Sequence, residues 1–173
     1  CFKNMQQISV VVCHDCRNNS RLFAETVANI FSANGIKVYL FDDLRPTPEC
    51  SFAIRHFKAQ GGVNITASHN PREYNGYKAY WDDGAQVLAP HDKGIINQVN
   101  QVKIEDVLFK GNKNLIEIIG EDVDKAYLNM VKTVCIDPDV IKRQHNLCIV
   151  YTAPDVLLYH VRYKNGDSQT CIA

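Results

Sequence analysis

The chain has 173 residues, of which 46% are apolar, and its 19 basic residues balance its 19 acidic ones, so the formal net charge at pH 7 is zero. Proteins that bind nucleic acid without regard to sequence need a basic excess, so we expect no nucleic-acid partner. No apolar run approaches the roughly 20 residues that cross a membrane, and we expect no membrane partner. The length suits one domain and part of a second.

Seven scattered cysteines do not suggest a disulfide framework. Cys13 and Cys16 have the spacing of metal ligands, but a zinc site needs two further ligands and no second pair is evident. Cys13 also ends an apolar run, which favours burial. We therefore expect reduced thiols and a cytoplasmic protein.

The first elements follow a strand, helix, strand order. Residues 8–13 form a continuous apolar run, typical of a strand buried on both faces. Asn19 or Ser20 can cap a following helix, which Gly35 would end in a left-handed conformation. A second strand is predicted at residues 36–41. The apolar face of the helix is predicted to consist of Phe23, Val27, Ile30 and Phe31.

A second helix and a third strand complete this pattern. Thr47-Pro48 places a proline at the start of a helix, and Gly61-Gly62 is predicted to end it. Residues 63–67 would be the third strand. The order predicts an α/β fold, with a mixed but mainly parallel sheet and helices on both faces.

The later elements are less regular. Residues 77–81 and 85–88 are predicted to form a hairpin around an Asp-Gly turn. A short helix is predicted at residues 92–102 and a longer one at 121–134, with irregular chain at 103–120. Asp137-Pro138 would break the second helix, and residues 147–151 would begin a new strand. The inward faces are predicted to be Ile95, Ile96, Val99 and Val102 in the first helix, and Val123, Tyr127, Met130, Val131 and Val134 in the second.

Polar residues follow each of the three predicted parallel strands. They occupy residues 14–17, 42–45 and 68–70. Ligands of such sheets gather beyond the carboxyl ends of the strands. Three separate segments are therefore expected to meet at one edge of the sheet.

The most informative of these segments reads Thr66-Ala67-Ser68-His69-Asn70-Pro71. The proline forces a turn, so a hydroxyl is presented on a sharp bend after a strand, with an imidazole beside it and Lys78 ten residues later. An ordinary Ser/Asn turn is the alternative, because these residues dominate turns.

Three segments together carry a family resemblance, which covers about residues 7–152. The serine segment, followed by Asn75-Gly76-Tyr77-Lys78, resembles the active-serine loop of the α-D-phosphohexomutases, and the phosphoglucomutase/phosphomannomutase group in particular. The stretch from His14 to Arg21 resembles that family's Asp-x-Arg-x-x-Ser segment. Residues 42–48 resemble its threonine-proline loop.

The resemblance implies an isomerase that exchanges a phosphoryl group between Ser68 and a hexose phosphate through a bisphosphate intermediate. It implies that Lys78 acts in acid–base catalysis, with His69 as a further catalytic residue. Arg17 and Asn70 would bind substrate or phosphate. The implied cofactors are Mg²⁺, which Ser68 would bind through its phosphate, and glucose 1,6-bisphosphate as activator. The preference among glucose, mannose and pentose phosphates stays open.

The resemblance also implies domain boundaries. Residues 1–145 would be the family's first domain without its opening strand and loop, and residues 146–152 the start of the second domain. Residues 153–173 resemble nothing in the family and are interpreted as a divergent tail. We expect an inactive fragment that lacks the metal and sugar-recognition loops.

Two other functions are compatible with a serine on a turn in an α/β fold. A serine hydrolase is disfavoured because the chain has no G-x-S-x-G segment. A non-catalytic α/β binding or scaffold module remains the alternative function for this polypeptide.

Overall fold

The structure is a computed structural model that describes residues 7–144, 148–153, 156–164 and 167–172. Its first part is built on a five-stranded sheet with the order β4-β3-β1-β2-β5. Strands β3, β1, β2 and β5 are parallel, and β4 is an antiparallel edge strand. This confirms the predicted mixed, mainly parallel sheet. The strands are β1 (Ser9–His14), β2 (Lys37–Phe41), β3 (Gly61–Ile65), β4 (Tyr77–Trp81) and β5 (Ile116–Ile119).

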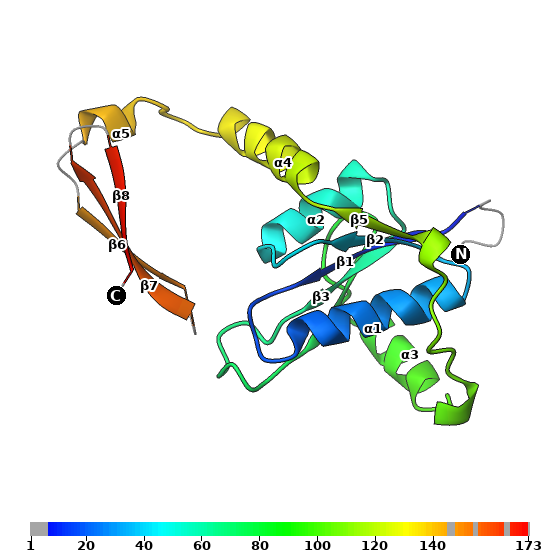
Figure 1. Cartoon of the computed structure of the whole chain (residues 1–173). Helices are drawn as coiled ribbons and strands as arrows, with labels where there is room; N and C mark the ends of the chain where they lie inside the picture. The colour runs from blue at the N-terminus through cyan, green and yellow to red at the C-terminus, as the bar shows by residue number, and fades with distance from the viewer. Residues whose placement is uncertain (1–6, 145–147, 154–155, 165–166, 173) are drawn as a thin grey trace.

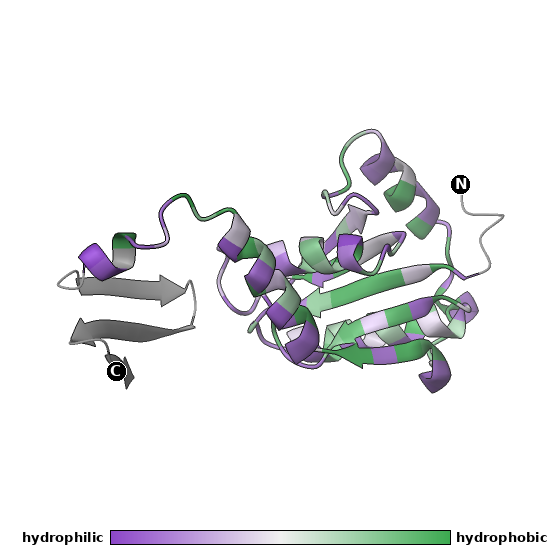
Figure 2. Cartoon of the chain, turned by 90° about the horizontal axis from the view of Figure 1, so that it is seen from above, coloured by the Kyte–Doolittle hydropathy of each residue, from purple (hydrophilic) through white to green (hydrophobic). Residues whose placement is uncertain are grey.

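Helices cover both faces of this sheet (Figure 1). The helix α1 (Ser20–Ala33) packs on one face, and α2 (Thr47–His56) packs on the other together with the start of α4 (Glu121–Thr133). Because successive side chains of a strand point to opposite faces, β1 serves both cores. Val10 and Val12 join the core under α1, and Val11 and Cys13 join the core under α2. The sheet strands are accordingly largely green in the hydropathy view of Figure 2.

The buried face of α1 is rotated from the predicted one. Ala24 and Ala28 are fully buried against the sheet, whereas Phe23 is 41% exposed. Val27 and Phe31 are only partly buried at the side of the core. Small residues at the contact let the helix backbone approach the strands closely, so the bulky residues flank the contact instead of filling it.

The prediction that Gly61-Gly62 ends α2 was wrong, because α2 ends at His56 and the glycines begin β3. A Cβ on Gly61 would lie 2.7 Å from the carbonyl oxygen of Tyr80, and one on Gly62 would lie 2.5 Å from Ile54 Cδ1. Both positions are glycine because neighbouring groups approach the strand too closely for a side chain. Gly35, by contrast, follows α1 with a φ of 78°, as predicted.

The hairpin and the segment after it differ from expectation. The turn at Gly84 forms, with a φ of 78°, but the returning strand is reduced to a single bridge between Tyr80 and Gln86. Residues 103–120, predicted to be irregular, contain two 3₁₀ turns and the strand β5, which pairs with β2 at the sheet edge. At four residues, β5 is too short for its alternation to stand out from the sequence.

The helix α3 (His91–Val99) has no buried residue. Its predicted inward face is exposed, from 38% at Ile95 to 57% at Ile96, Val99 and Val102, so that prediction was wrong for the described chain. In α4 only Val123 is buried, and Val134, at its end, is 69% exposed. An apolar stripe shows which face of a helix can pack, but the stripe does not supply the partner.

The described residues beyond α4 comprise α5 (Val140–Arg143) and a second, three-stranded antiparallel sheet of β6 (Cys148–Ala153), β7 (Val156–Lys164) and β8 (Asp167–Ile172) (Figure 1). The strand predicted at residues 147–151 corresponds to β6, with residue 147 outside the described residues. The domain boundaries at residues 145, 146 and 152 remain predictions. None of the helices in the described ranges is both long and apolar enough to span a membrane.

Candidate active site

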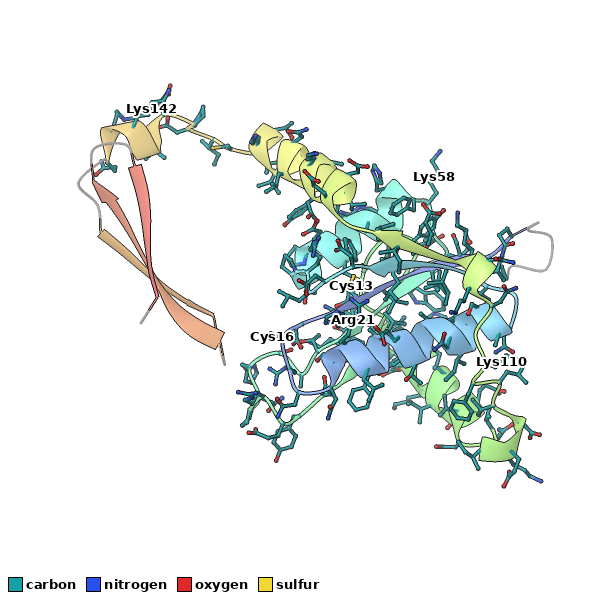
Figure 3. All side chains as sticks on the ribbon, in the orientation of Figure 1. Cys13, Cys16, Arg21, Lys58, Lys110 and Lys142 are labelled. Carbon is teal, nitrogen blue, oxygen red and sulfur yellow. The ribbon has the colours of Figure 1, made fainter. Side chains whose placement is uncertain are left out.

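The three polar segments meet at the carboxyl end of the parallel strands, as expected. The Asp15 amide donates to the carbonyl of Ile65 at 3.2 Å, and the Arg45 amide donates to the carbonyl of His14 at 3.1 Å. Backbone hydrogen bonds thus join the segment after β1 to the end of β3, and the segment after β2 to the end of β1. Figure 3 shows Cys16 and Arg21 at this end of the sheet, where β1 leads into α1.

Ser68 lies on an exposed bend two residues after Thr66. Its φ of 57° is left-handed, which is uncommon for a residue with a side chain. The Ser68 amide donates to Thr66 Oγ1 at 3.1 Å. The amide side chain of Asn70 donates to the Ala67 carbonyl at 2.9 Å, and the Asn70 backbone N–H donates to the same carbonyl. Local hydrogen bonds therefore close the turn around Ser68.

Lys78 reaches this bend from the neighbouring strand. Strand β4 returns antiparallel to β3 with Lys78 opposite Asn64, near the end of β3 that leads to the serine loop. Lys78 Nζ donates to Ser68 Oγ at 2.5 Å. The sequence predicted both residues for the site, and the fold places their polar atoms in contact. His69 is exposed beside Ser68 on the same bend.

Arg17 lies beneath the loop rather than at its surface. Its side chain is only 3% exposed. Nη1 donates to the carbonyls of Asn70 at 2.5 Å and Pro71 at 2.8 Å, and Nη2 donates to the carbonyl of Ser68. Nε donates to Asp15 Oδ2 at 3.0 Å. These contacts orient the loop, and the predicted phosphate-binding role of Arg17 remains a prediction.

Ser20 and Asn75 tie the loop to the start of α1. Ser20 Oγ lies 3.0 Å from Asp15 Oδ1 and 2.8 Å from Asn75 Oδ1. Asn75 Nδ2 donates to the Asn18 carbonyl at 2.6 Å. Sequence reasoning did not assign Asn75 to the site, although its place before Gly76 in the serine segment was a usable signal. The base of the loop is thus a connected polar network.

A second polar cluster lies at the same sheet edge, between β2, α2 and α4. Arg45 donates to both carboxylate oxygens of Asp124, at 2.6 and 2.8 Å, and to Asp42 Oδ1 at 3.0 Å. Burial, and then hydrogen bonding with Asp124, raises the pKa of Glu49 to about 7. The Arg45 guanidinium holds the pKa of Asp124 below its ordinary value. Sequence reasoning missed Glu49 and Asp124 because they are 75 residues apart and separated by three strands.

Within the part of the chain that the structure describes, no group of three or more His, Cys, Asp or Glu side chains converges to hold an ion. Cys13 and Cys50 are buried thiols, and burial raises the pKa of Cys13. A phosphate on Ser68 would supply a single ligand, so the described residues do not by themselves fit a Mg²⁺ site.

The site therefore consists of a serine on an exposed bend, in contact with a lysine, at the carboxyl edge of an α/β sheet. The sequence model described as phosphoglucomutase/phosphomannomutase, alpha/beta/alpha domain I matches residues 1–105. The chain therefore belongs to the phosphoglucomutase/phosphomannomutase family.

Individual relatives agree. Human phosphopentomutase is 45% identical over 106 residues, which cover 58% of this chain and 17% of that protein. Human glucose 1,6-bisphosphate synthase is 35% identical over 147 residues, covering 78% of this chain and 24% of that protein. The crystal structure of a Thermus thermophilus protein assigned as a phosphomannomutase matches with a TM-score of 0.65 and 33% identity, over 74% of this chain and 28% of that one. The chain spans about a quarter or less of the length of the curated relatives that it matches.

Proposed function

We propose that Ser68 is the phosphoryl carrier of a sugar-phosphate mutase and that Lys78 handles the proton in the transfer. The observation that carries the proposal is the 2.5 Å contact between Lys78 Nζ and Ser68 Oγ on an exposed bend. A serine hydroxyl is a poor nucleophile without such a partner. His69, adjacent on the bend, and Asn70, at its turn, are proposed to contact the phosphate or the sugar.

The proposed step is a phosphoryl exchange. The bond between the phosphorus and Ser68 Oγ breaks as the bond between the phosphorus and a sugar hydroxyl oxygen forms. The Lys78 amine accepts the proton of that hydroxyl and delivers it to Ser68 Oγ, which leaves as a hydroxyl. In the reverse direction Lys78 takes the proton of the Ser68 hydroxyl as Ser68 Oγ takes the phosphoryl group, and it delivers that proton to the sugar oxygen. Such transfers depend on positioning and charge stabilisation, which the fixed Ser68 and Lys78 supply.

The substrate is proposed to be a hexose 1-phosphate or 6-phosphate, with glucose 1,6-bisphosphate as activator and Mg²⁺ as the metal. The similarity to human glucose 1,6-bisphosphate synthase supports a bisphosphate ligand. The phosphopentomutase relatives favour a second candidate, a pentose phosphate. Coupled assays with glucose 1-phosphate and ribose 1-phosphate, on a full-length enzyme that carries this segment, separate the two. A cytoplasmic location is part of the proposal.

The direct test is the intact mass of the purified chain before and after incubation with glucose 1,6-bisphosphate and Mg²⁺. We expect the gain of one phosphoryl group on Ser68 and no gain in Ser68→Ala. We also expect the isolated chain to lack mutase turnover in a coupled assay. A wild-type chain that never acquires phosphate, beside a full-length enzyme that also shows none on this serine, would remove Ser68 from the reaction.

A further inference from the structure

The Asp15-x-Arg17-x-x-Ser20 segment contacts the serine loop through its side chains. Arg17 donates to loop carbonyls, Ser20 lies 2.8 Å from Asn75 Oδ1, and Asp15 holds both Arg17 and Ser20. Asp15 accepts from the Arg17 side chain with Oδ2 and from the Arg17 backbone N–H with Oδ1, at 3.0 and 3.1 Å. The segment therefore forms a base on which the loop rests.

The guanidinium of Arg17 is suited to fix the loop backbone. It is planar, it is always charged, and its donors are held in a rigid fork. One arm donates to Asn70 and Pro71, and the other donates to the carbonyl of Ser68 itself. Because the side chain is 3% exposed, water competes little for these hydrogen bonds.

The conformation of Ser68 needs such support. A left-handed serine is unfavourable in isolation, and it persists only where its surroundings over-determine it. Thr66 accepts from the Ser68 amide on one side, and Arg17 donates to the Ser68 carbonyl on the other. With both peptide groups held, the hydroxyl is directed toward Lys78.

We propose that Arg17, oriented by Asp15, is a positioning residue that holds the Ser68 backbone in its left-handed conformation and so keeps the hydroxyl on Lys78. The carboxylate of Asp15 balances the charge of the Arg17 guanidinium. The main effect of Arg17 is therefore on the geometry of the serine loop rather than on attraction of the anionic substrate. The conformational part stands on the contacts alone, and the catalytic consequence rests on the proposed function.

The experiment follows the NMR resonance of the Lys78 ε-carbon in the full chain, assigned by its loss in Lys78→Arg. Ser68→Ala defines the shift that accompanies loss of the hydroxyl. We expect Arg17→Ala to shift the resonance in the same way, and the double variant to shift it no further. Added guanidinium ion at millimolar concentration is expected to return the Arg17→Ala resonance toward the wild-type position, whereas urea is not.

The matched control is Arg72→Gln. Arg72 belongs to the same loop but is exposed, and its guanidinium donates to the Asn18 side chain rather than to the backbone of the serine turn. We expect the Lys78 resonance to stay in place in this variant. If Arg17→Ala does not fold, Asp15→Asn keeps the guanidinium and is expected to shift the Lys78 resonance part of the way.

A folded Arg17→Ala, or a folded Asp15→Asn in its place, with a wild-type Lys78 resonance would overturn the proposal. Phosphorylation by glucose 1,6-bisphosphate separates this result from a failure of the proposed function. If the wild-type chain is phosphorylated and Arg17→Ala is phosphorylated equally fast, the positioning role is wrong and Ser68 remains the carrier. If the NMR shifts appear and a full-length enzyme is never phosphorylated on Ser68, the positioning role of Arg17 stands and Ser68 is not the carrier.

Discussion

Two arginines organise the same edge of the sheet in different ways. Arg17 is buried and donates to backbone carbonyls of the serine loop, and its Nε donates to the carboxylate of Asp15. Arg45 is 15% exposed in its side chain and donates mainly to carboxylates, from Asp42 and Asp124. Neutral carbonyls keep their acceptor strength at every pH, whereas carboxylates change charge. The first arginine therefore fixes a backbone conformation, and the second joins the segment before α2 to α4 in a manner that depends on protonation.

The largest effect should come from the oxygen that the Arg17 network presents. In a full-length enzyme carrying this segment, Ser68→Ala is expected to abolish mutase turnover and to leave the free energy of unfolding nearly unchanged, because the exposed hydroxyl contributes little to the core. Steady-state kinetics and chemical denaturation measure the two quantities. Unaltered turnover would break the assignment.

The next largest effect should come from Lys78. Lys78→Met is expected to lower kcat by on the order of 10²–10⁴, the range found when a general acid or base is lost. A rise in KM with an unchanged kcat would indicate that Lys78 only binds substrate. Lys93→Met, at an exposed lysine on α3, is the control and should alter neither constant.

The Arg45 cluster should act on stability and not on the serine loop. Arg45→Met leaves Glu49 and Asp124 facing each other without their cation, and we expect a loss of about 1–3 kcal/mol in the free energy of unfolding, less than for a fully buried pair because Asp124 is partly exposed. Arg55→Met, at an exposed arginine of α2, should cost much less. A changed Lys78 resonance in Arg45→Met would show that the two clusters are coupled.

The smallest effect is the pH dependence. The folded chain holds a proton on Glu49 up to about pH 7, whereas the ordinary pKa is 4.5, so this group stabilises the fold below pH 4.5 and loses that contribution as the pH rises to 7. We expect Glu49→Gln to remove a decline on the order of 1–2 kcal/mol over this interval, which is less than about 1.4 kcal/mol for each unit of the pKa shift would give, because solvent screens part of the interaction. Denaturation curves from pH 4.5 to 8 measure it.

The pKa shift of Asp124 changes the stability with pH in the opposite direction to that of Glu49. Its lowered pKa contributes stability above its ordinary value of 3.8, and that contribution disappears as the pH falls through the folded value. The interval above pH 4.5 therefore reports Glu49 with little interference. Glu25→Gln, at an exposed glutamate paired with Arg21 on α1, is the control and should leave the slope unchanged. An equal slope in Glu49→Gln and the wild type would contradict the assignment.

The sequence by itself determined the order of the early elements and the place of the bend that carries Ser68. Local features suffice there: a continuous apolar run at residues 8–13 predicts a buried strand, and Asn70-Pro71 predicts a turn that exposes Ser68. Parallel strands joined by short helices must also bring the carboxyl ends of β1, β2 and β3 to one edge. These inferences hold because each depends on neighbours in the chain or on the chirality of the crossover.

Only the tertiary structure decided what depends on distant neighbours. Arg17 as a support of the loop, the burial of Gly61 and Gly62 against other segments, and the raised pKa of Glu49 each require a group from elsewhere in the chain. The stripe of α3 shows the same limit, since its apolar spacing fits a buried helix and yet nothing in the described chain covers it. Periodicity reports which face of an element can be buried. Burial, close approach and charge coupling are properties of pairs of surfaces, and the fold brings those pairs together.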